Sequence, residues 1–194
     1  MPRPRAFDPA DVLAAAQRVF RAKGYEAASV QDLVDATGLS RSSLYAAFGD
    51  KHGLYLAVLD RYAAEGRRAL QDLCGCTSPL GAARAYLSRV ASEPAEGEGV
   101  PLGCLMVNAA AECASRDPET ARRAGDTRRG MAQTFERLVR DAQEAGEVAP
   151  DRDPVALAHF LTGAVYGLQG LKKAGAEAEA LESVVETTLR ALER

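Results

Sequence analysis

Apolar residues recur every three or four positions along most of the chain, and alternating runs of β-branched residues are scarce. This spacing is typical of helices that bury one face. We therefore predict an all-α protein with about nine helices. The expected ranges are Asp8–Lys23, Ser29–Thr37, Ser40–Ala47, Asp50–Leu73, Pro79–Ala91, Leu102–Ala114, Pro118–Ala145, Pro154–Ala174 and Glu177–Glu193.

Helix starts and stops are marked by residues with capping chemistry. A capping side chain precedes proline at Asp8-Pro9, Ser78-Pro79, Asp117-Pro118 and Asp153-Pro154. Proline suits the first helical position because its missing N–H has no intrahelical partner there. Ser29 and Asp32 form a capping-box pattern. Gly24, Gly38 and Gly146 are predicted helix stops, since glycine readily adopts a positive φ.

The first three predicted helices are short and closely joined. The first carries a buried apolar stripe at Val12, Leu13, Ala16, Val19 and Phe20. Between the second and third, Thr37–Ser40 forms a tight turn that contains Gly38. Two short helices joined by such a turn form a helix-turn-helix, whose second helix lies in the major groove of DNA. On that helix Leu44 and Phe48 are predicted to face inward. The side chains expected to face outward are Arg41, Ser42, Ser43 and Tyr45.

At these residues the chain resembles the DNA-binding domain of the tetracycline-repressor (TetR) family. The resemblance runs without a gap from about Phe7 to Leu59. It is carried by Gly24-Tyr25, Ser29–Leu33, Thr37–Ser40 and Leu44–Lys51. It implies a DNA-binding domain over residues 1–50, with the helix-turn-helix at about 29–48. Residues 51–194 would then form a helical domain for effector binding and dimerisation.

The resemblance also implies roles for individual residues. Ser29 would cap the second helix and touch a phosphate, and Tyr45 and Lys51 would contact the DNA backbone. The residues implied in the major groove are Ser40, Arg41, Ser42 and Ser43. Arg41 is the best candidate for a bidentate contact with guanine. The alternative is an ordinary three-helix subdomain in which these charges are solvated. The family usually has glutamate at the position of Gly53, and a glycine there is expected to weaken the helix by about 0.5–1 kcal/mol.

Apolar stripes on the last two predicted helices indicate a dimer interface. The expected interface residues are Leu157, Leu161, Ala164, Leu168, Leu181, Val185 and Leu189. Gly163, Gly167 and Gly170 add small positions where another helix could approach closely. A protein that binds a two-fold symmetric operator needs two DNA-binding domains about one helical turn of DNA apart. The resemblance places the dimer interface in these two helices. The alternative is that the stripes are ordinary core.

An effector pocket is expected among the helices of the C-terminal part. The candidate lining residues are Cys104, Asn108, Met131, Phe135, His159, Phe160 and Tyr166. Each of these residues could instead be an ordinary core residue. Asn108 is informative because a buried amide needs a hydrogen-bonding partner.

The four cysteines suggest two further hypotheses. Cys104 near a helix start could be a redox or electrophile switch, and Cys113 is expected to be a small buried hydrophobe. Cys74 and Cys76 could bind a metal, although the further cysteines and histidines of a zinc finger are missing. A thiol enzyme would need a nearby base, and His52 and His159 are the only histidines. We therefore predict no enzyme, catalytic residue, metal or cofactor.

Composition adds little to the case for DNA binding. The net charge is −3, so any basic surface must be local. No run of about 18 apolar residues occurs, and no secretory signal is seen. We therefore expect a cytoplasmic, nucleoid-associated protein that does not bind membranes. Glu93–Pro101 is predicted to be a surface loop. The expected partners are double-stranded operator DNA, a second copy of the chain and a small-molecule effector that releases this repressor from a palindromic operator.

Overall fold

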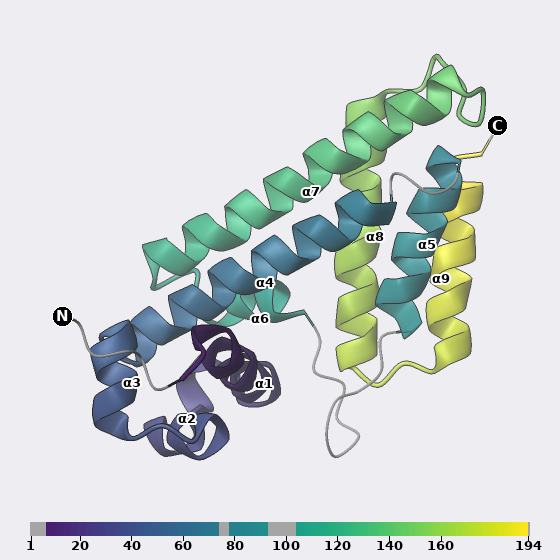
Figure 1. The fold of residues 1–194 in the computed structure, drawn as a ribbon. Helices are drawn as coiled ribbons and strands as arrows, with labels where there is room; N and C mark the ends of the chain where they lie inside the picture. Colours follow the sequence, from purple (N-terminus) through teal and green to yellow (C-terminus); the bar gives the residue numbers. More distant parts are fainter. Residues whose placement is uncertain (1–6, 74–77, 93–103, 194) are drawn as a thin grey trace. The chain divides into compact units, whose positions relative to one another are not determined.

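The computed structural model describes residues 7–73, 78–92 and 104–193, and these residues form nine helices and no strand (Figure 1). The helices are α1 (Pro9–Ala27), α2 (Val30–Thr37), α3 (Arg41–Phe48), α4 (Lys51–Leu73), α5 (Pro79–Ser92), α6 (Leu105–Glu112), α7 (Pro118–Glu144), α8 (Pro154–Lys173) and α9 (Ala178–Arg190). The all-α prediction is confirmed.

The predicted capping residues make the expected hydrogen bonds. The carboxylate of Asp8 accepts from the Ala10 amide at 2.8 Å, and that of Asp153 accepts from the Val155 amide at 2.9 Å. Asp117 and Ser78 cap α7 and α5 in the same manner, at 3.0 and 3.1 Å. These bonds satisfy amides that have no partner inside the helix, which is why the helix starts could be located from sequence.

Three predicted helix stops have a positive φ: Gly24 at 79°, Gly38 at 68° and Gly146 at 76°. At Gly24 the chain kinks inside α1 and does not end it. The start of α6 was predicted too early, because Cys104 has extended angles of −84° and 125° and the helix follows it. Leu102 and the predicted loop Glu93–Pro101 lie outside the described residues.

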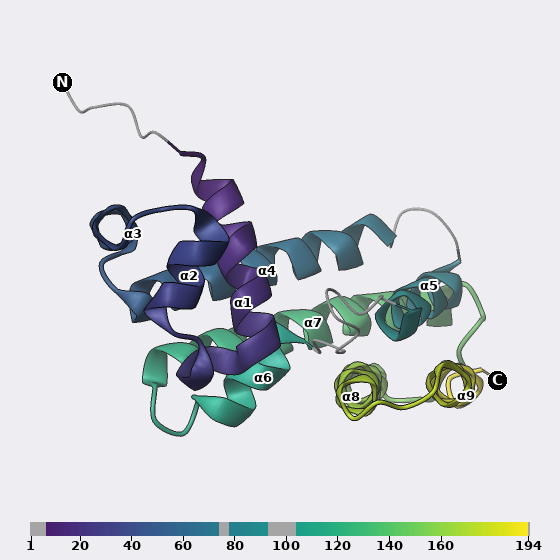
Figure 2. The same cartoon turned by 90° about the horizontal axis from the view of Figure 1, so that it is seen from below.

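The chain packs as two compact units. Unit 1 comprises residues 7–64 and 104–124 of the described chain. In it α1 packs against α2 and α6, and α2 packs against α3 (Figure 2). Its core contains Phe20, Leu33, Leu44 and Tyr55 together with Leu105 of α6. The N-terminal helices are therefore supported by a helix that is remote in sequence.

Unit 2 comprises residues 65–73, 78–92 and 125–193 of the described chain. Here α5, α8 and α9 pack on one another, and Figure 2 shows α8 and α9 side by side. The core includes Leu87, Phe135, Leu161, Leu168 and Leu189. None of the described helices has the length and apolar character to cross a membrane.

This packing divides the chain in a different place from the predicted boundary after residue 50. The first turns of α4, all of α6 and the first turns of α7 belong to unit 1. Their apolar side chains, such as Leu54 and Met106, enter the same core as Phe20. A boundary drawn along the sequence cannot anticipate this, because residues 104–124 return to the N-terminal helices.

Candidate nucleic-acid interface

The start of α2 is fixed by a complete capping box. The Ser29 hydroxyl accepts from the Asp32 amide at 3.1 Å, and the Ser29 amide donates to the Asp32 carboxylate at 2.9 Å. Lys23 of α1 donates to the same carboxylate at 2.7 Å. The hydrogen bond from Lys23, followed by those from Ser29, lowers the pKa of Asp32 to about 2. The carboxylate is therefore ionised at neutral pH and joins α1 to α2.

The turn into α3 is equally well defined. Gly38, in the left-handed conformation, donates its amide to the Val34 carbonyl at 2.9 Å. The Ser40 hydroxyl caps α3 by accepting from the Ser43 amide at 3.2 Å. The hydroxyls of Ser42 and Ser43 each lie 2.9 Å from that of Ser40. The start of α3 thus presents a cluster of hydroxyls.

Burial of one residue fixes which face of α3 points outward. Leu44 is fully buried in the core of unit 1, whereas Arg41 and Ser42 are exposed and Ser43 is half-buried. Tyr45 is half-buried and packs against the same core. The structure therefore presents Arg41 and Ser42 to solvent at the start of α3, as the sequence predicted.

Lys51, in the first turn of α4, lies over the turn that follows Gly24. Its Nζ is 4.5 Å from the centroid of the Tyr25 ring and donates to the Glu26 carbonyl at 3.4 Å. A cation over an aromatic face is attracted by the ring quadrupole. An ammonium has three N–H donors, so this contact leaves Lys51 able to bind a phosphate as well.

Glu112, which ends α6, was missed by the sequence reasoning. Its carboxylate accepts from the amides of Tyr25 at 2.9 Å and Glu26 at 2.8 Å. A Cβ on Gly24 would lie 2.6 Å from the same carboxylate, which would have to shift, and the φ of 79° at this position independently favours glycine. No local pattern could have revealed the contact, since the partners are 86 and 87 residues apart.

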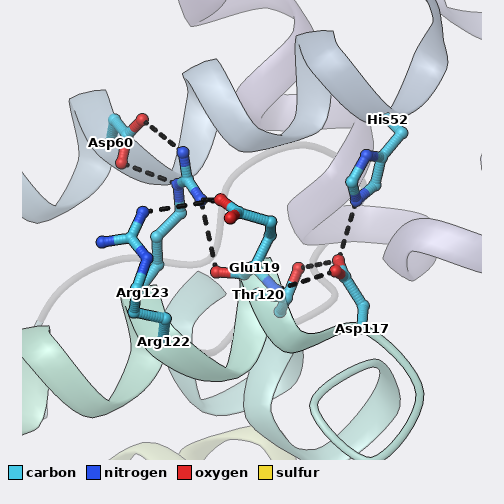
Figure 3. A network of polar contacts seen from close by, with 7 residues as sticks. All are labelled: His52, Asp60, Asp117, Glu119, Thr120, Arg122 and Arg123. Atoms are coloured by element: carbon cyan, nitrogen blue, oxygen red, sulfur yellow. Dashed lines mark hydrogen bonds and ion pairs between the residues drawn. The ribbon is translucent and has the colours of Figure 1, made fainter.

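A second polar network joins α4 to the start of α7 within unit 1 (Figure 3). His52 Nε2 lies 2.8 Å from Asp117 Oδ2, and the Thr120 hydroxyl donates to the same oxygen at 2.5 Å. Burial alone would raise the pKa of Asp117, but these bonds and two backbone amides outweigh it and lower the pKa to about 2. Asp117 therefore serves both as the predicted helix cap and as a partner of His52.

The same figure shows a second bridge between α4 and α7. Asp60 accepts from Arg123 at 2.9 Å, and Arg123 also contacts Glu119 one turn earlier. The Arg123 side chain is 15% exposed, so this pair is partly shielded from solvent. It adds a second fixed point between the two helices.

Gly53 has a packing role that the sequence reasoning did not anticipate. Gly49, with φ 86° and ψ −67°, turns the Phe48 carbonyl toward α4. A Cβ on Gly53 would lie 2.1 Å from that oxygen, far inside van der Waals contact. Gly53 also donates its amide to Asp50 at 2.7 Å. The residue was predicted to weaken the helix, whereas the structure shows that any side chain here would displace the end of α3.

We therefore expect Gly53→Ala to destabilise the protein by about 1–3 kcal/mol, the usual cost of overpacking. Gly66 is the matched control: it lies on the same helix, is exposed, and an added Cβ would meet no described atom within 4 Å. Gly66→Ala should stabilise the protein by about 0.5–1 kcal/mol. Urea unfolding measures both changes, and two shifts of the same sign would contradict this role of Gly53.

The predicted dimer residues need a correction. Six of the seven are buried inside the protomer, and Ala164 is half-buried: the six are Leu157, Leu161, Leu168, Leu181, Val185 and Leu189. Their side chains fill the core of unit 2, so they are not a surface that a second copy could contact. The outward face of α8 instead carries Phe160, Gly163, Gly167, Gly170 and Leu171.

The residues predicted to line an effector pocket divide between the two units. Cys104 and Asn108 belong to unit 1, and the other five to unit 2. Phe135 is fully buried, 5.8 Å from the Tyr86 ring, which favours packing for this residue. Phe160 is 47% exposed, so it is a surface residue of the protomer.

The remaining candidates lie at the edges of the core of unit 2. Met131 packs against it, Tyr166 is half-buried and His159 is exposed. His159 lines an open depression whose other residues are Arg128, Arg129, Ala132, Gln133, Glu136, Val155 and Ala158. Of the five candidates in unit 2, His159 alone is among the residues that line this depression.

Two of the four cysteines, Cys104 and Cys113, lie within the described residues. Cys113 is buried, as predicted, and burial raises the pKa of its thiol. Cys104 is half-buried at the start of α6. Cys74 and Cys76 lie outside the described residues. Within the described part, no group of three His, Cys, Asp or Glu residues could hold a metal ion.

An all-α chain with an outward-facing helix-turn-helix defines a DNA-binding regulator. Residues 12–58 match the model of bacterial regulatory proteins of the tetR family, and residues 81–188 match a tetracyclin repressor-like C-terminal domain. The chain belongs to the TetR family. Proteins of this family are transcriptional regulators and not enzymes.

Relatives along nearly the whole chain agree with this assignment. The repressor ComR of Escherichia coli K12 is 34% identical, over 97% of this chain and 90% of ComR. The regulator YezE of Bacillus subtilis is 31% identical over the whole of both chains. A solved structure of the TetR regulator CifR, a cysteine mutant in complex with a 26 bp operator, is 34% identical with a TM-score of 0.85. It covers 97% of this chain and 99% of the CifR chain.

Proposed function

We propose that this protein is a homodimeric repressor that binds a palindromic operator and leaves it when a small-molecule effector binds. The observation that carries the proposal is the start of α3, where Arg41 and Ser42 face solvent on a helix whose opposite side is locked by Leu44. A helix presented in this manner fits the major groove. The similarity to ComR, a transcriptional repressor, and to CifR, solved in complex with operator DNA, supports the same function.

Individual roles follow from chemistry and position. Arg41 can form two parallel hydrogen bonds to guanine O6 and N7. The hydroxyls of Ser40, Ser42 and Ser43 can contact neighbouring bases or phosphates. Contacts to the DNA backbone are assigned to Ser29, Tyr45 and Lys51. These backbone contacts set the register of α3, and Arg41 supplies sequence preference.

The proposed dimer uses the face of α8 that the protomer leaves uncovered, together with α9. Phe160 is 47% exposed and Leu171 is 41% exposed, and between them lie the small residues Gly163, Gly167 and Gly170. An added Cβ at any of these three glycines would meet no described atom within 4 Å. Small residues flanked by large apolar ones allow a second helix to pack closely and bury apolar area.

An effector can shift operator binding only through a difference in its affinity for the two states of the protein. We place its site in the C-terminal part of the chain, and the protein's action on chromosomal DNA in the cytoplasm. Sensing by Cys104 or by Cys74 and Cys76 was the alternative considered from sequence, and it is not favoured by the match to TetR-type repressors.

The first test uses DNA. The wild-type protein is used to select duplexes from a random-sequence library, and a two-fold symmetric site should be enriched. Arg41→Ala should then weaken binding by about 1–3 kcal/mol for each half-site and relax the preference at the base pair contacted in each half-site. Enrichment of no site, or an unchanged preference in the variant, would contradict the proposed function.

Lys51→Ala should act differently, because a phosphate contact carries no sequence information. It should weaken all duplexes alike and reduce the slope of log K against log salt by about 1.8, because each protomer of the dimer loses one phosphate contact worth about 0.9. Arg140→Ala, which removes an exposed charge from unit 2, is the control. A slope that stays at the wild-type value in Lys51→Ala would remove Lys51 from the interface.

A further inference from the structure

The turn from Gly24 to Glu26 is held from two sides by different helices of unit 1. Glu112 of α6 accepts from the amides of Tyr25 and Glu26. Lys51 of α4 contacts the Tyr25 ring and the Glu26 carbonyl. The turn therefore lies between the carboxylate and the ammonium, and both contact the same two residues.

Glu112 determines where this turn lies. A carboxylate that accepts two backbone amides forms charge-assisted hydrogen bonds, which are stronger than neutral ones. A Cβ added to Gly24 would lie only 2.6 Å from the carboxylate, so Glu112 approaches the backbone closely. Since the Glu26 carbonyl and the Tyr25 ring are the contacts of the Lys51 ammonium, a shift of the turn moves both of them.

A second carboxylate from the same part of the chain acts on the residue after Lys51. Asp117, five positions beyond Glu112, accepts from or pairs with His52 at 2.8 Å. Figure 3 shows His52 pointing from α4 toward Asp117 at the start of α7. Thr120 and the Glu119 amide also bond to Asp117 and hold its carboxylate in place.

We propose that Glu112 and Asp117 are positioning residues for DNA binding, which fix the Lys51 ammonium where it can reach a phosphate. The inference rests on the proposed function, since it concerns the same interface. It goes further by assigning control of DNA affinity to two carboxylates on α6 and α7, outside the helix-turn-helix. Neither side chain needs to touch DNA.

The sign of the effect separates positioning from simple charge. Removing a negative charge from a protein that binds a polyanion should strengthen DNA binding through Coulomb attraction. Loss of the position of Lys51 should weaken it. Glu112→Gln removes the charge with little change of shape, so its effect on affinity has opposite signs under the two explanations.

The experiment compares Glu112→Gln with Glu136→Gln, which removes the same charge from α7 in unit 2. Affinity for the selected operator is measured against salt. Glu112→Gln should bind about tenfold more weakly, a change of about 1.4 kcal/mol, with a slope reduced by about 1.8, since both protomers lose the Lys51 contact. Glu136→Gln should bind as tightly as wild type or more tightly. Adding Lys51→Ala to Glu112→Gln should cost little more, because both changes remove one contact.

Folding is checked by hydrogen exchange. In Glu112→Gln the amides of Tyr25 and Glu26 should lose protection while that of Leu44 in α3 keeps it. Asp117→Asn is a second variant, since asparagine still caps α7 but loses the charge facing His52. It should also weaken operator binding and reduce the salt slope.

Three outcomes would overturn the inference: wild-type or tighter operator binding by Glu112→Gln, an unchanged salt slope, or full additivity with Lys51→Ala. Wild-type affinity in Asp117→Asn would remove Asp117 from the proposal. In all of these the wild-type protein still binds its operator and the proposed function stands. If the wild-type protein selects no operator, the proposed function itself fails.

Discussion

Gly167→Arg is expected to make the protein monomeric and to lower operator affinity by about a hundredfold or more. A monomer has a single DNA-binding domain, which can contact only one half-site of a two-fold symmetric operator. Gly167 is exposed on α8, and an added Cβ meets no described atom within 4 Å. Arginine also favours the helical conformation more than glycine does, by up to about 1 kcal/mol. The protomer should therefore fold, and the added side chain should interfere only with a second copy packed against α8.

Gly66→Arg is the matched control for this change. Gly66 is also an exposed helical glycine with open space around it, but it lies on α4. Light scattering after gel filtration gives the mass of each variant, and the selected operator duplex gives the affinity. A Gly167→Arg protein that remains dimeric and binds like wild type would exclude the outer face of α8 as the interface.

Phe135→Ala should lower the free energy of unfolding by about 3–5 kcal/mol, the range for removing a fully buried phenylalanine. Phe135 is 0% exposed in the core of unit 2, and its ring makes an edge contact with Tyr86. Alanine would leave a cavity among close-packed side chains, which lose both burial and dispersion contacts.

Gln133→Ala, two residues earlier and exposed, should change stability by less than about 0.5 kcal/mol. Both variants are unfolded in urea at one protomer concentration, because the stability of a dimer depends on concentration. A loss of less than about 1 kcal/mol in Phe135→Ala would show that the site is not tightly packed. Phe135 would then again be a candidate for the effector pocket.

Local residue patterns were sufficient to predict the helices and the helix-turn-helix. Caps such as Asp8 and Ser29 act over two or three residues, so their hydrogen bonds can be predicted from neighbours along the chain. Gly38 and Leu44 set the turn and the inward face of α3 by equally local rules. Local sequence was therefore enough to place Arg41 on the surface.

The core face of α8, in contrast, could be identified only from the packed structure. Periodicity finds a stripe such as Leu157, Leu161 and Leu168, but it cannot tell packing within a protomer from packing between protomers, because both bury the same apolar area. In the structure, side chains of α5 and α9 pack against that stripe within the same protomer. Gly163, Gly167 and Gly170, already named from sequence as small positions, are the part of the predicted interface that stays exposed.

Long-range contacts were likewise beyond local reasoning. Glu112 meets Tyr25 and Glu26 across more than eighty residues, and Gly53 is needed because the Phe48 carbonyl turns over it. Both depend on where the backbone goes after each helix ends. Helical spacing specifies faces and caps, whereas the partner on each face is set by the packing of the whole core.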